Sequence, residues 1–318
     1  MRDGGYDPRP GTAETLMPGV RRVLARNPGP MTFRGTNTYL VGAGEVAVID
    51  PGPDEPAHLA AILAALAPGE RVTAILVTHP HRDHSPLAPR LATATGAPVM
   101  AWGTPSDGRS AVMQRLAETG AAGGGEGVDT EFRPDVRLGD GAAIALGGDR
   151  ITALWTPGHM ASHLCFVWRD AIFTGDLVMG WASSLISPPD GDLSAFMASC
   201  KRLEARPERL YLPGHGAPVA DGPARAADLR AHRAARTDQV RAALAAGPAS
   251  LATLTAQVYA DVDRALHPAA ARNLFAHLVA LHEAGEIEAR PCLDPAGTFR
   301  RTGPARRRKN ATTPLDGP

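Results

Sequence analysis

The sequence predicts an α/β fold that is followed by a smaller helical module. Over residues 45–212, short apolar segments rich in β-branched residues alternate with segments of helical periodicity. After Gly216 the pattern changes to long helical stretches that end in a hairpin. Because strands that alternate with helices pack as layers around a shared core, we expect the first part to form an α/β domain.

Seven segments carry the strand pattern. Each is short and apolar, as expected for strands with at least one buried face. The segment 72–77 is apolar on both faces and is therefore predicted to be a buried strand. The predicted strands are residues 45–50, 72–77, 97–102, 151–155, 164–168, 171–173 and 209–212.

Two helices are predicted between these strands, at residues 56–66 and 193–203. In the first, apolar residues recur every three or four positions, which places them on one helical face. Pro56 suits a first helical turn, and Pro68 and Gly69 would end the helix.

The region after Gly216 predicts three helices and a hairpin. A long helix should open at the segment 221–223 and close at the Gly-Pro pair 247–248. Ser250 can cap a short helix that runs to Tyr259, and a third helix is expected from His267 to Gly285. Residues 286–299 then resemble a small hairpin. This order of elements fits a winged-helix module.

Composition places the chain among ordinary globular proteins. Hydrophobic residues make up 44% and charged residues 21%, and the formal net charge is zero, so no global field attracts nucleic acid or a membrane. No apolar run reaches membrane-spanning length, and residues 1–10 lack the apolar core of a secretory signal. Cys165, Cys200 and Cys292 lie far apart and predict reduced, unpaired thiols. We therefore expect a cytoplasmic protein without a membrane partner.

Side chains of the kind that bind metals gather directly after predicted strands. The richest segment is the loop 78–84, and three later segments each place one such side chain beside a glycine. Imidazole and carboxylate groups without thiolate suit zinc, manganese or iron. The sequence thus predicts a metal site built from several strand ends. Its candidate ligands are His79, His81, Asp83, His84, His159, Asp176 and His215.

The His-x-His-x-Asp-His pattern of residues 79–84, with the three later segments, resembles the metallo-β-lactamase superfamily over residues 31–217. The resemblance includes the segments 35–42 and 50–52. It implies a four-layer αββα sandwich of two facing sheets with helices outside. With its C-terminal region, the chain is most similar to the β-lactamase-like protein 2 branch, which carries a winged-helix domain and includes an endoribonuclease.

This resemblance implies a binuclear metal-dependent hydrolase. A hydroxide shared by two divalent ions would attack a carbonyl carbon or a phosphorus atom. Zinc is the first choice for the two ions, with iron or manganese as alternatives. The resemblance assigns His79, His81 and His159 to the first ion and Asp83, His84 and His215 to the second, with Asp176 bridging both.

Asp83, Asp176 and His163 are the predicted catalytic residues. His163 lies four residues after His159, outside the ligand set, where it would contact substrate or relay a proton, or else support the ligands by packing. Asp50 ends a predicted strand before a Pro-Gly turn. It would either form that turn or accept a hydrogen bond from a ligand imidazole.

The residues leave the substrate open. An RNA phosphodiester and a small acyl ester, thioester or lactone are attacked by the same nucleophile, and the segment 181–190 is expected to form part of the pocket wall that chooses between them. Two other functions remain possible: a nucleic-acid-binding regulator with a vestigial metal site, and an iron-dependent redox enzyme of the same fold.

We divide the chain into a metallo-β-lactamase catalytic domain (1–222), a linking helix with a winged-helix-like domain (223–300) and a disordered basic tail (301–318). Between residues 248 and 299 there are three arginines, no lysine and six acidic residues. This net acidic charge disfavours a groove-reading function and favours a module that packs on the catalytic domain or shapes its cleft. Arginines of the linking helix and the tail could guide single-stranded RNA, or simply form a solvated helix face and an unstructured end. The oligomeric state cannot be predicted.

Overall fold

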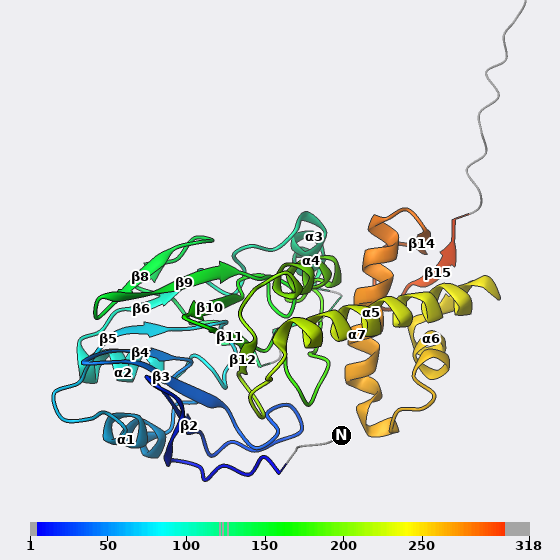
Figure 1. The fold of residues 1–318 in the computed structure, drawn as a ribbon. Helices are drawn as coiled ribbons and strands as arrows, with labels where there is room; N and C mark the ends of the chain where they lie inside the picture. Colours follow the sequence, from blue (N-terminus) through cyan, green and yellow to red (C-terminus); the bar gives the residue numbers. More distant parts are fainter. Residues whose placement is uncertain (1–4, 121, 123, 126, 303–318) are drawn as a thin grey trace, which may run out of the picture.

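The computed structural model describes residues 5–120, 122, 124–125 and 127–302. Figure 1 shows a larger lobe formed by the first two thirds of the chain and a smaller, mainly helical lobe formed by the rest. The long helix α5 (Gly222–Ala245) runs along both lobes and contacts α4 in the larger lobe and α6 and α7 in the smaller.

The first sheet of the larger lobe has seven strands in chain order. Its first four strands pair antiparallel, and the remaining ones join in parallel. The strands are β1 (Ala13–Met17), β2 (Val20–Leu24), β3 (Asn37–Ala43), β4 (Glu45–Ile49), β5 (Arg71–Leu76), β6 (Val99–Ala101) and β7 (Val136–Arg137).

The second sheet has five strands in the order β12-β11-β10-β9-β8, and only the β11–β12 pair is parallel. The two sheets face each other across one apolar core, in which the rings of Tyr39 and Phe173 meet edge to face with centroids 5.0 Å apart. The strands are β8 (Ala143–Leu146), β9 (Asp149–Trp155), β10 (Leu164–Trp168), β11 (Ala171–Gly175) and β12 (Leu210–Pro213).

Helices cover the outer faces of both sheets. Ile62 of α1 and Leu91 of α2 pack against the first sheet, and Phe196 of α4 packs against the second. Asp192 caps α4 by accepting hydrogen bonds from the backbone of Ser194 and Ala195. The predicted αββα sandwich is therefore confirmed. The helices of this lobe are α1 (Pro56–Ala64), α2 (Ala88–Thr95), α3 (Ala111–Thr119) and α4 (Leu193–Glu204).

The smaller lobe combines helices with a three-stranded sheet in the order β13-β15-β14. Ser250 caps α6 as predicted, because its hydroxyl accepts from the backbone N–H of Thr253. Leu274 and Phe299 lie in its core, which Met113 of α3 joins from the larger lobe. The winged-helix prediction is confirmed. Its elements are β13 (Ala249–Ser250), α6 (Leu251–Val258), the 3₁₀ helix η1 (Arg264–Leu266), α7 (His267–Glu283), β14 (Ile287–Arg290) and β15 (Thr298–Arg301).

Residues 301 and 302, predicted to begin a disordered tail, are instead held by backbone hydrogen bonds. Arg301 pairs with Ile287 in the small sheet, and the backbone N–H of Thr302 donates to the carbonyl of Glu286 at 3.0 Å. These backbone hydrogen bonds tie both residues to β14 and its preceding turn. Residues 303–318, which hold the rest of the predicted tail, lie outside the described residues.

All three cysteines are free: Cys165 and Cys200 are buried, and Cys292 is exposed. Burial raises the pKa of the Cys165 thiol to about 12, so this group stays protonated at neutral pH. Across the described ranges, every helix is too short or too polar to traverse a lipid bilayer.

Candidate metal centre

The seven predicted ligand side chains meet in one place. Loops that follow β5, β9, β11 and β12 supply them, so segments far apart in the chain converge on one end of the sandwich. Three overlapping groups each hold ligand atoms within 4.8 Å of one another. These groups are His79, His81 and His159; His79, His84 and Asp176; and Asp83, His84 and His215.

In the first group, three ring nitrogens face one another. His81 Nδ1 lies 3.0 Å from His79 Nε2 and 3.1 Å from His159 Nε2. The other nitrogen of His159, Nδ1, lies 2.7 Å from the carbonyl of Leu185. A carbonyl only accepts hydrogen bonds, so Nδ1 carries the proton and the lone pair of Nε2 points into the group.

The same logic applies to the group of Asp83, His84 and His215. His215 donates from Nδ1 to the carbonyl of Gly35 at 3.1 Å, and His84 Nδ1 lies 2.9 Å from the Asp50 carboxylate. Both rings therefore present Nε2, and these two atoms are 3.3 Å apart. Asp83 Oδ2 lies 3.0 Å from His215 Nε2.

Asp176, which belongs to the remaining group, lies between the group of His79, His81 and His159 and the group of Asp83, His84 and His215. Its Oδ1 is 3.6 Å from His84 Nε2, and its Oδ2 is 3.5 Å from His215 Nε2 and 3.8 Å from His159 Nε2. Oδ1 is buried and has no hydrogen-bond partner among the described residues. A buried carboxylate oxygen without a partner is costly unless a cation compensates it, so the residues fit metal ions on both sides of Asp176.

The pKa values of the side chains at the site indicate that it favours positive charge. Burial alone would lower the pKa of His84, but the carboxylates of Asp83 and Asp50 outweigh it and raise that pKa to about 9. Burial would raise the pKa of Asp176, but His215 and His84 hold it well below its usual range. By contrast, burial and the neighbouring His159 lower the pKa of His81 to about 3, so this ring is neutral and can act as a ligand.

Asp50 lies outside the set of candidate ligands and hydrogen-bonds to residues of the loop that carries four of them. Its carboxylate accepts hydrogen bonds from the backbone N–H and the hydroxyl of Thr78, each at 2.7 Å, and from His84. The Thr78 hydroxyl thereby becomes an acceptor for His79 Nδ1 at 2.9 Å. The hydrogen bond from a ligand imidazole to Asp50 is thus present. Asp50 has a positive φ of 49°, a conformation that aspartate tolerates better than most residues.

Asn37 fixes the loop that carries His215. Its amide donates to the carbonyls of Pro213 and Gly216, both at 2.9 Å. The hydroxyl of Tyr39 donates to Pro213 as well, at 2.7 Å. The local sequence pattern does not predict these contacts, because they join segments of the two sheets that lie far apart in the chain.

His163 lies behind the ligands rather than among them. Its side chain is fully buried, and its ring centroid is 5.3 Å from that of His79. Nδ1 lies 3.0 Å from the hydroxyl of Thr156, and Nε2 has no hydrogen-bond partner in the described part of the chain. Of the roles considered for His163, this position favours support of the ligands over contact with substrate.

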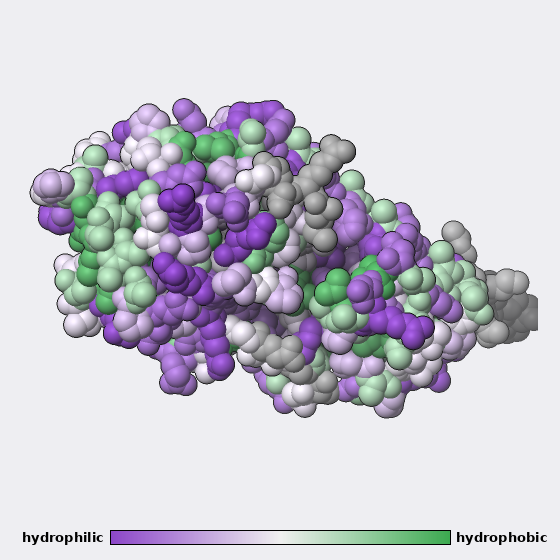
Figure 2. All heavy atoms as spheres, turned by 90° about the horizontal axis from the view of Figure 1, so that it is seen from below, coloured by the Kyte–Doolittle hydropathy of each residue, from purple (hydrophilic) through white to green (hydrophobic). Residues whose placement is uncertain are grey.

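A cleft leads from the centre to the smaller lobe. Two pockets of about 260 and about 390 Å³ adjoin each other there and share Met31, His159, Asp176, Leu185 and Ala269 in their walls. Figure 2 shows the surface hollowed where the larger and smaller lobes meet.

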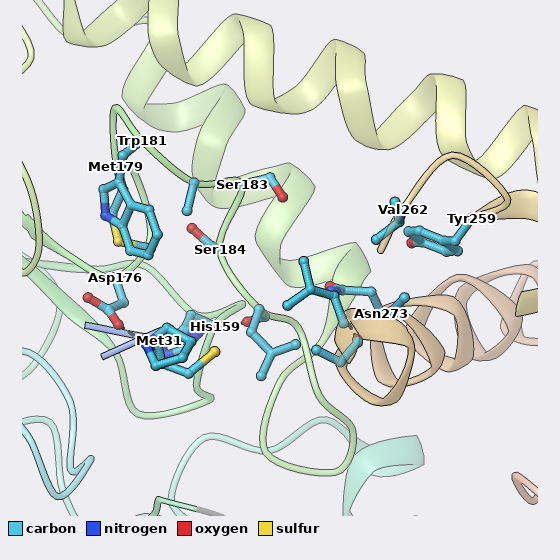
Figure 3. A pocket seen from close by; sticks show the side chains of 16 residues that line it. Met31, His159, Asp176, Met179, Trp181, Ser183, Ser184, Tyr259, Val262 and Asn273 are labelled. Carbon is cyan, nitrogen blue, oxygen red and sulfur yellow. Dashed lines mark hydrogen bonds and ion pairs between the residues drawn. The ribbon is translucent and has the colours of Figure 1, made fainter. Parts of the chain in front are cut away.

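The walls of this cleft come from both lobes. Figure 3 shows Met179 and Trp181 of the larger lobe beside Asp176, and Tyr259 and Val262 of the smaller lobe across the pocket. The lining is mainly apolar. The most exposed large hydrophobic side chains of the described residues, Met31 (55%) and Leu266 (51%), lie at the pocket. The segment 181–185 is part of the wall, as expected.

The arginine side chains of α5 donate hydrogen bonds to carbonyl and carboxylate groups of the protein itself. Arg225 donates to the carbonyls of Met179 and Ala182, at 2.8 and 3.0 Å. The others contact carboxylates or carbonyls of neighbouring elements: Arg230 with Glu204, Arg233 with Ser183 and Ser184, Arg236 with Val258, and Arg241 with Glu286 and Asp238.

The chain belongs to the metallo-beta-lactamase superfamily. The family described as metallo-beta-lactamase superfamily matches residues 31–215, and the beta-lactamase associated winged helix domain matches residues 250–291. The protein is accordingly a hydrolase of a superfamily that typically binds divalent metals.

Fungal proteins are among its relatives. The chain is 33% identical over 241 residues to the lactamase-like protein adaB of Aspergillus niger, an alignment that covers 74% of this chain and 67% of that protein. It is 34% identical over 235 residues to an atrochrysone carboxyl ACP thioesterase of Aspergillus chevalieri, with 73% and 67% covered.

Two crystal structures match across both lobes. A beta-lactamase domain protein from Burkholderia ambifaria has a TM-score of 0.74 at 25% identity and covers 93% of this chain and 96% of its own. A metallo-beta-lactamase family protein from Thermus thermophilus has a TM-score of 0.71 at 27% identity, with 91% and 100% covered.

Proposed function

We propose that this enzyme hydrolyses small acyl thioesters or esters whose acyl group is apolar. The observation that carries this proposal is the mainly apolar cleft, which leads directly to His159 and Asp176. An enclosed apolar wall removes an acyl group from water and contributes about 25 cal/mol per Å² buried. A polyanionic backbone would gain nothing from such a surface.

The relatives support a thioester. One of them is named an atrochrysone carboxyl ACP thioesterase, and the aligned region covers 73% of this chain. The bond that this name describes is an acyl carbonyl attached to sulfur. For the present enzyme, we therefore place thioesters ahead of lactones and oxygen esters as the substrate class to test first.

The residues fit two divalent ions, as proposed from the resemblance. When bound, such ions lower the pKa of water towards about 7 and polarise a carbonyl oxygen, which is the chemistry that hydrolysis of an acyl bond requires. The proposed ligands are His79, His81 and His159 for one ion and Asp83, His84 and His215 for the other, with Asp176 facing both.

The chain's own contribution is orientation and exclusion of water. The hydrogen bonds on Nδ1 of His84, His159 and His215 keep each Nε2 directed at the centre. Asp83 and Asp176 line the cleft, so their carboxylates lie where an acyl carbonyl would arrive. The apolar walls hold the acyl chain and keep bulk water away from it.

The charges of the helical region do not support RNA as the substrate. The five arginines that could guide a strand are engaged with carboxylates or carbonyls of the protein itself. The winged-helix module also carries more acidic than basic residues. A protein that binds a nucleic acid backbone needs free cationic side chains on its surface.

The test compares an aromatic or long-chain acyl thioester, a lactone and a single-stranded RNA, each with the wild-type enzyme and the Asp176→Ala variant. We expect thioester hydrolysis that falls at least about 100-fold in the variant. Asp176-dependent cleavage of RNA, with no turnover of any thioester, would refute the proposal. RNA cleavage that survives the substitution identifies a contaminating nuclease.

Zinc is the proposed metal, because imidazoles and carboxylates match its ligand preferences. Metal analysis of the purified enzyme distinguishes it from the iron-dependent redox alternative. A dominant iron content with an absorbance change on exposure to oxygen would favour redox chemistry. Zinc or manganese with thioesterase activity supports hydrolysis.

A further inference from the structure

We infer that Arg233 and Asn273, both outside the metal centre, are positioning residues that orient His159 through the loop 183–187. This inference rests on the proposed metal centre but not on the identity of the substrate. It assigns the helical region a part in building the centre. The loop lies between the cleft and the smaller lobe, and Leu185 at its middle touches the candidate ligand.

Arg233 is the first anchor. Only 2% of this residue is exposed, and its Nη2 donates to the carbonyls of Ser183 and Ser184, at 2.8 and 2.5 Å. No carboxylate forms an ion pair with it in the described part of the chain. Burying a cation without a counter-charge is unfavourable, so the two carbonyl contacts must be the main compensation. The geometry therefore ties Arg233 to the backbone of this loop.

Asn273 is the second anchor, on the other side of Leu185. Its Oδ1 accepts a hydrogen bond from the backbone N–H of Ile186 at 3.0 Å. Further along, Arg272 donates to the hydroxyl of Ser187 at 2.9 Å. Both side chains come from α7, so α5 holds the loop before Leu185 and α7 holds it after Leu185.

The backbone between these anchors has a conformation that needs support. Ser184 has a positive φ of 62°, in the left-handed region that residues other than glycine rarely adopt. Its hydroxyl donates to the carbonyl of Leu177 at 3.0 Å. The next peptide unit directs the Leu185 carbonyl at His159 Nδ1, 2.7 Å away. If the loop relaxes, this acceptor moves and the ring loses the contact that fixes its tautomer.

Groups that hydrogen-bond to a metal-binding histidine typically change metal affinity by 10–100-fold when they are removed. Arg233 and Asn273 act one step further out, through the backbone. We therefore expect their loss to weaken binding at the group of His79, His81 and His159, and to leave the group of Asp83, His84 and His215 less affected.

The experiment compares full-length Arg233→Met, Arg233→Lys and Asn273→Ala with an Arg230→Met control. Arg230 lies on the same helix, one turn before Arg233, but its guanidinium pairs with Glu204 of α4 rather than with the loop. Zinc affinity and stoichiometry are measured by competition with a chromogenic chelator. The absorption spectrum of the cobalt-substituted protein reports the ligand geometry, and thermal unfolding in excess chelator reports the fold.

We expect Arg233→Met and Asn273→Ala to bind one of the two ions at least about tenfold more weakly and to change the cobalt spectrum. Arg233→Lys should restore only part of the affinity, because an ammonium lacks the planar fork of the guanidinium. Arg230→Met should bind both ions like the wild type. If Arg233→Met does not fold, Asn273→Ala decides the question, since its side chain is only half-buried at the pocket edge.

Unchanged affinity and spectrum in folded Asn273→Ala and Arg233→Met proteins would overturn the inference, even if their melting temperatures fall. A wild-type enzyme that binds two ions yet hydrolyses no thioester would refute the proposed function and leave this inference standing. A wild-type protein that binds no zinc, manganese or iron would overturn both.

Discussion

At the scale of single residues, the centre is packed so closely that even a methyl group has no room. Gly214 precedes the candidate ligand His215, and a β-carbon built on it would lie 2.6 Å from His84 Cε1 and 2.7 Å from Asp176 Oδ1. His84 cannot retreat, because Asp50 holds its other side. The glycine beside this ligand is therefore a requirement of close approach.

We predict that Gly214→Ala weakens metal binding at least about tenfold and lowers the free energy of unfolding by about 1–3 kcal/mol, since the added carbon displaces a ligand. Metal content after dialysis and thermal unfolding measure the two effects. The matched control is Gly139→Ala, because nothing lies within 4 Å of a β-carbon at that exposed position. Equal behaviour of the two variants would contradict the prediction.

The convergence of the seven candidate ligands could be predicted from the sequence, because each follows a strand and stands beside a glycine or another candidate ligand. The acceptors that orient them could not. His215 donates to the carbonyl of Gly35, 180 positions away, and His159 donates to Leu185. Any residue type supplies a backbone carbonyl, so no sequence pattern marks these two positions. Only the fold brings them to the rings.

At the scale of elements, prediction succeeded where burial is uniform. β10 matches its predicted range, and β4, β5, β9, β11 and β12 match theirs within two residues, because their apolar runs are nearly continuous. β1 was missed because it is mostly exposed and carries polar residues, and β3 because it begins with the buried polar pair Asn37 and Thr38. The polar start of β3 serves the centre rather than the core.

The contact between α5 and α7 contains a buried histidine that should make the protein sensitive to acid. His277 Nδ1 lies 2.8 Å from the hydroxyl of Thr237, and Nε2 has no partner among the described residues. Burial, then the nearby cations Arg233 and Arg236, with a smaller contribution from His232, lower the pKa of His277 to about 3. The folded protein therefore keeps this ring neutral.

Since an unfolded histidine has a pKa of about 6.5, the unfolded chain binds a proton that the folded chain does not accept between pH 6.5 and 3. The stability is complete above pH 6.5 and falls as the pH decreases. Between pH 7 and pH 5, we expect the wild type to lose about 2 kcal/mol more than His277→Gln. Denaturant unfolding in excess chelator measures this difference. Parallel pH dependences of the two proteins would contradict it.

At the scale of the whole molecule, the cleft is a joint product of the two lobes. The larger lobe supplies the ligands and Met31, and the smaller lobe supplies Tyr259, Val262 and Leu266. The sequence predicted both modules, and the acidic composition of the second favoured packing of that module on the first or shaping of its cleft. Which side chains form the wall could not be predicted, because docking depends on residues that lie far apart in the chain. The acidic character of the smaller lobe was the one hint that it does not read nucleic acid.

We predict that Leu266→Asp raises the KM for apolar acyl thioesters about tenfold, because the wall loses an apolar side chain worth roughly 1.4 kcal/mol of binding. The kcat should change little, since Leu266 is about half exposed at the pocket and belongs to none of the candidate ligand groups. Steady-state kinetics with acyl groups of different length measure both. Val136→Asp is the control, as Val136 is exposed on β7 and does not line either pocket of the cleft. A fall in kcat without a change in KM would refute this assignment.

The shared cleft has an evolutionary consequence. The candidate ligands all lie before position 216, while part of the cleft wall that we propose to bind the acyl group comes from residues after position 250. Selection can therefore alter the substrate specificity by changing residues of the winged-helix module, without changing the metal centre. Chimeras that exchange this module between related enzymes should inherit the donor's preference among acyl groups and retain the recipient's chemistry.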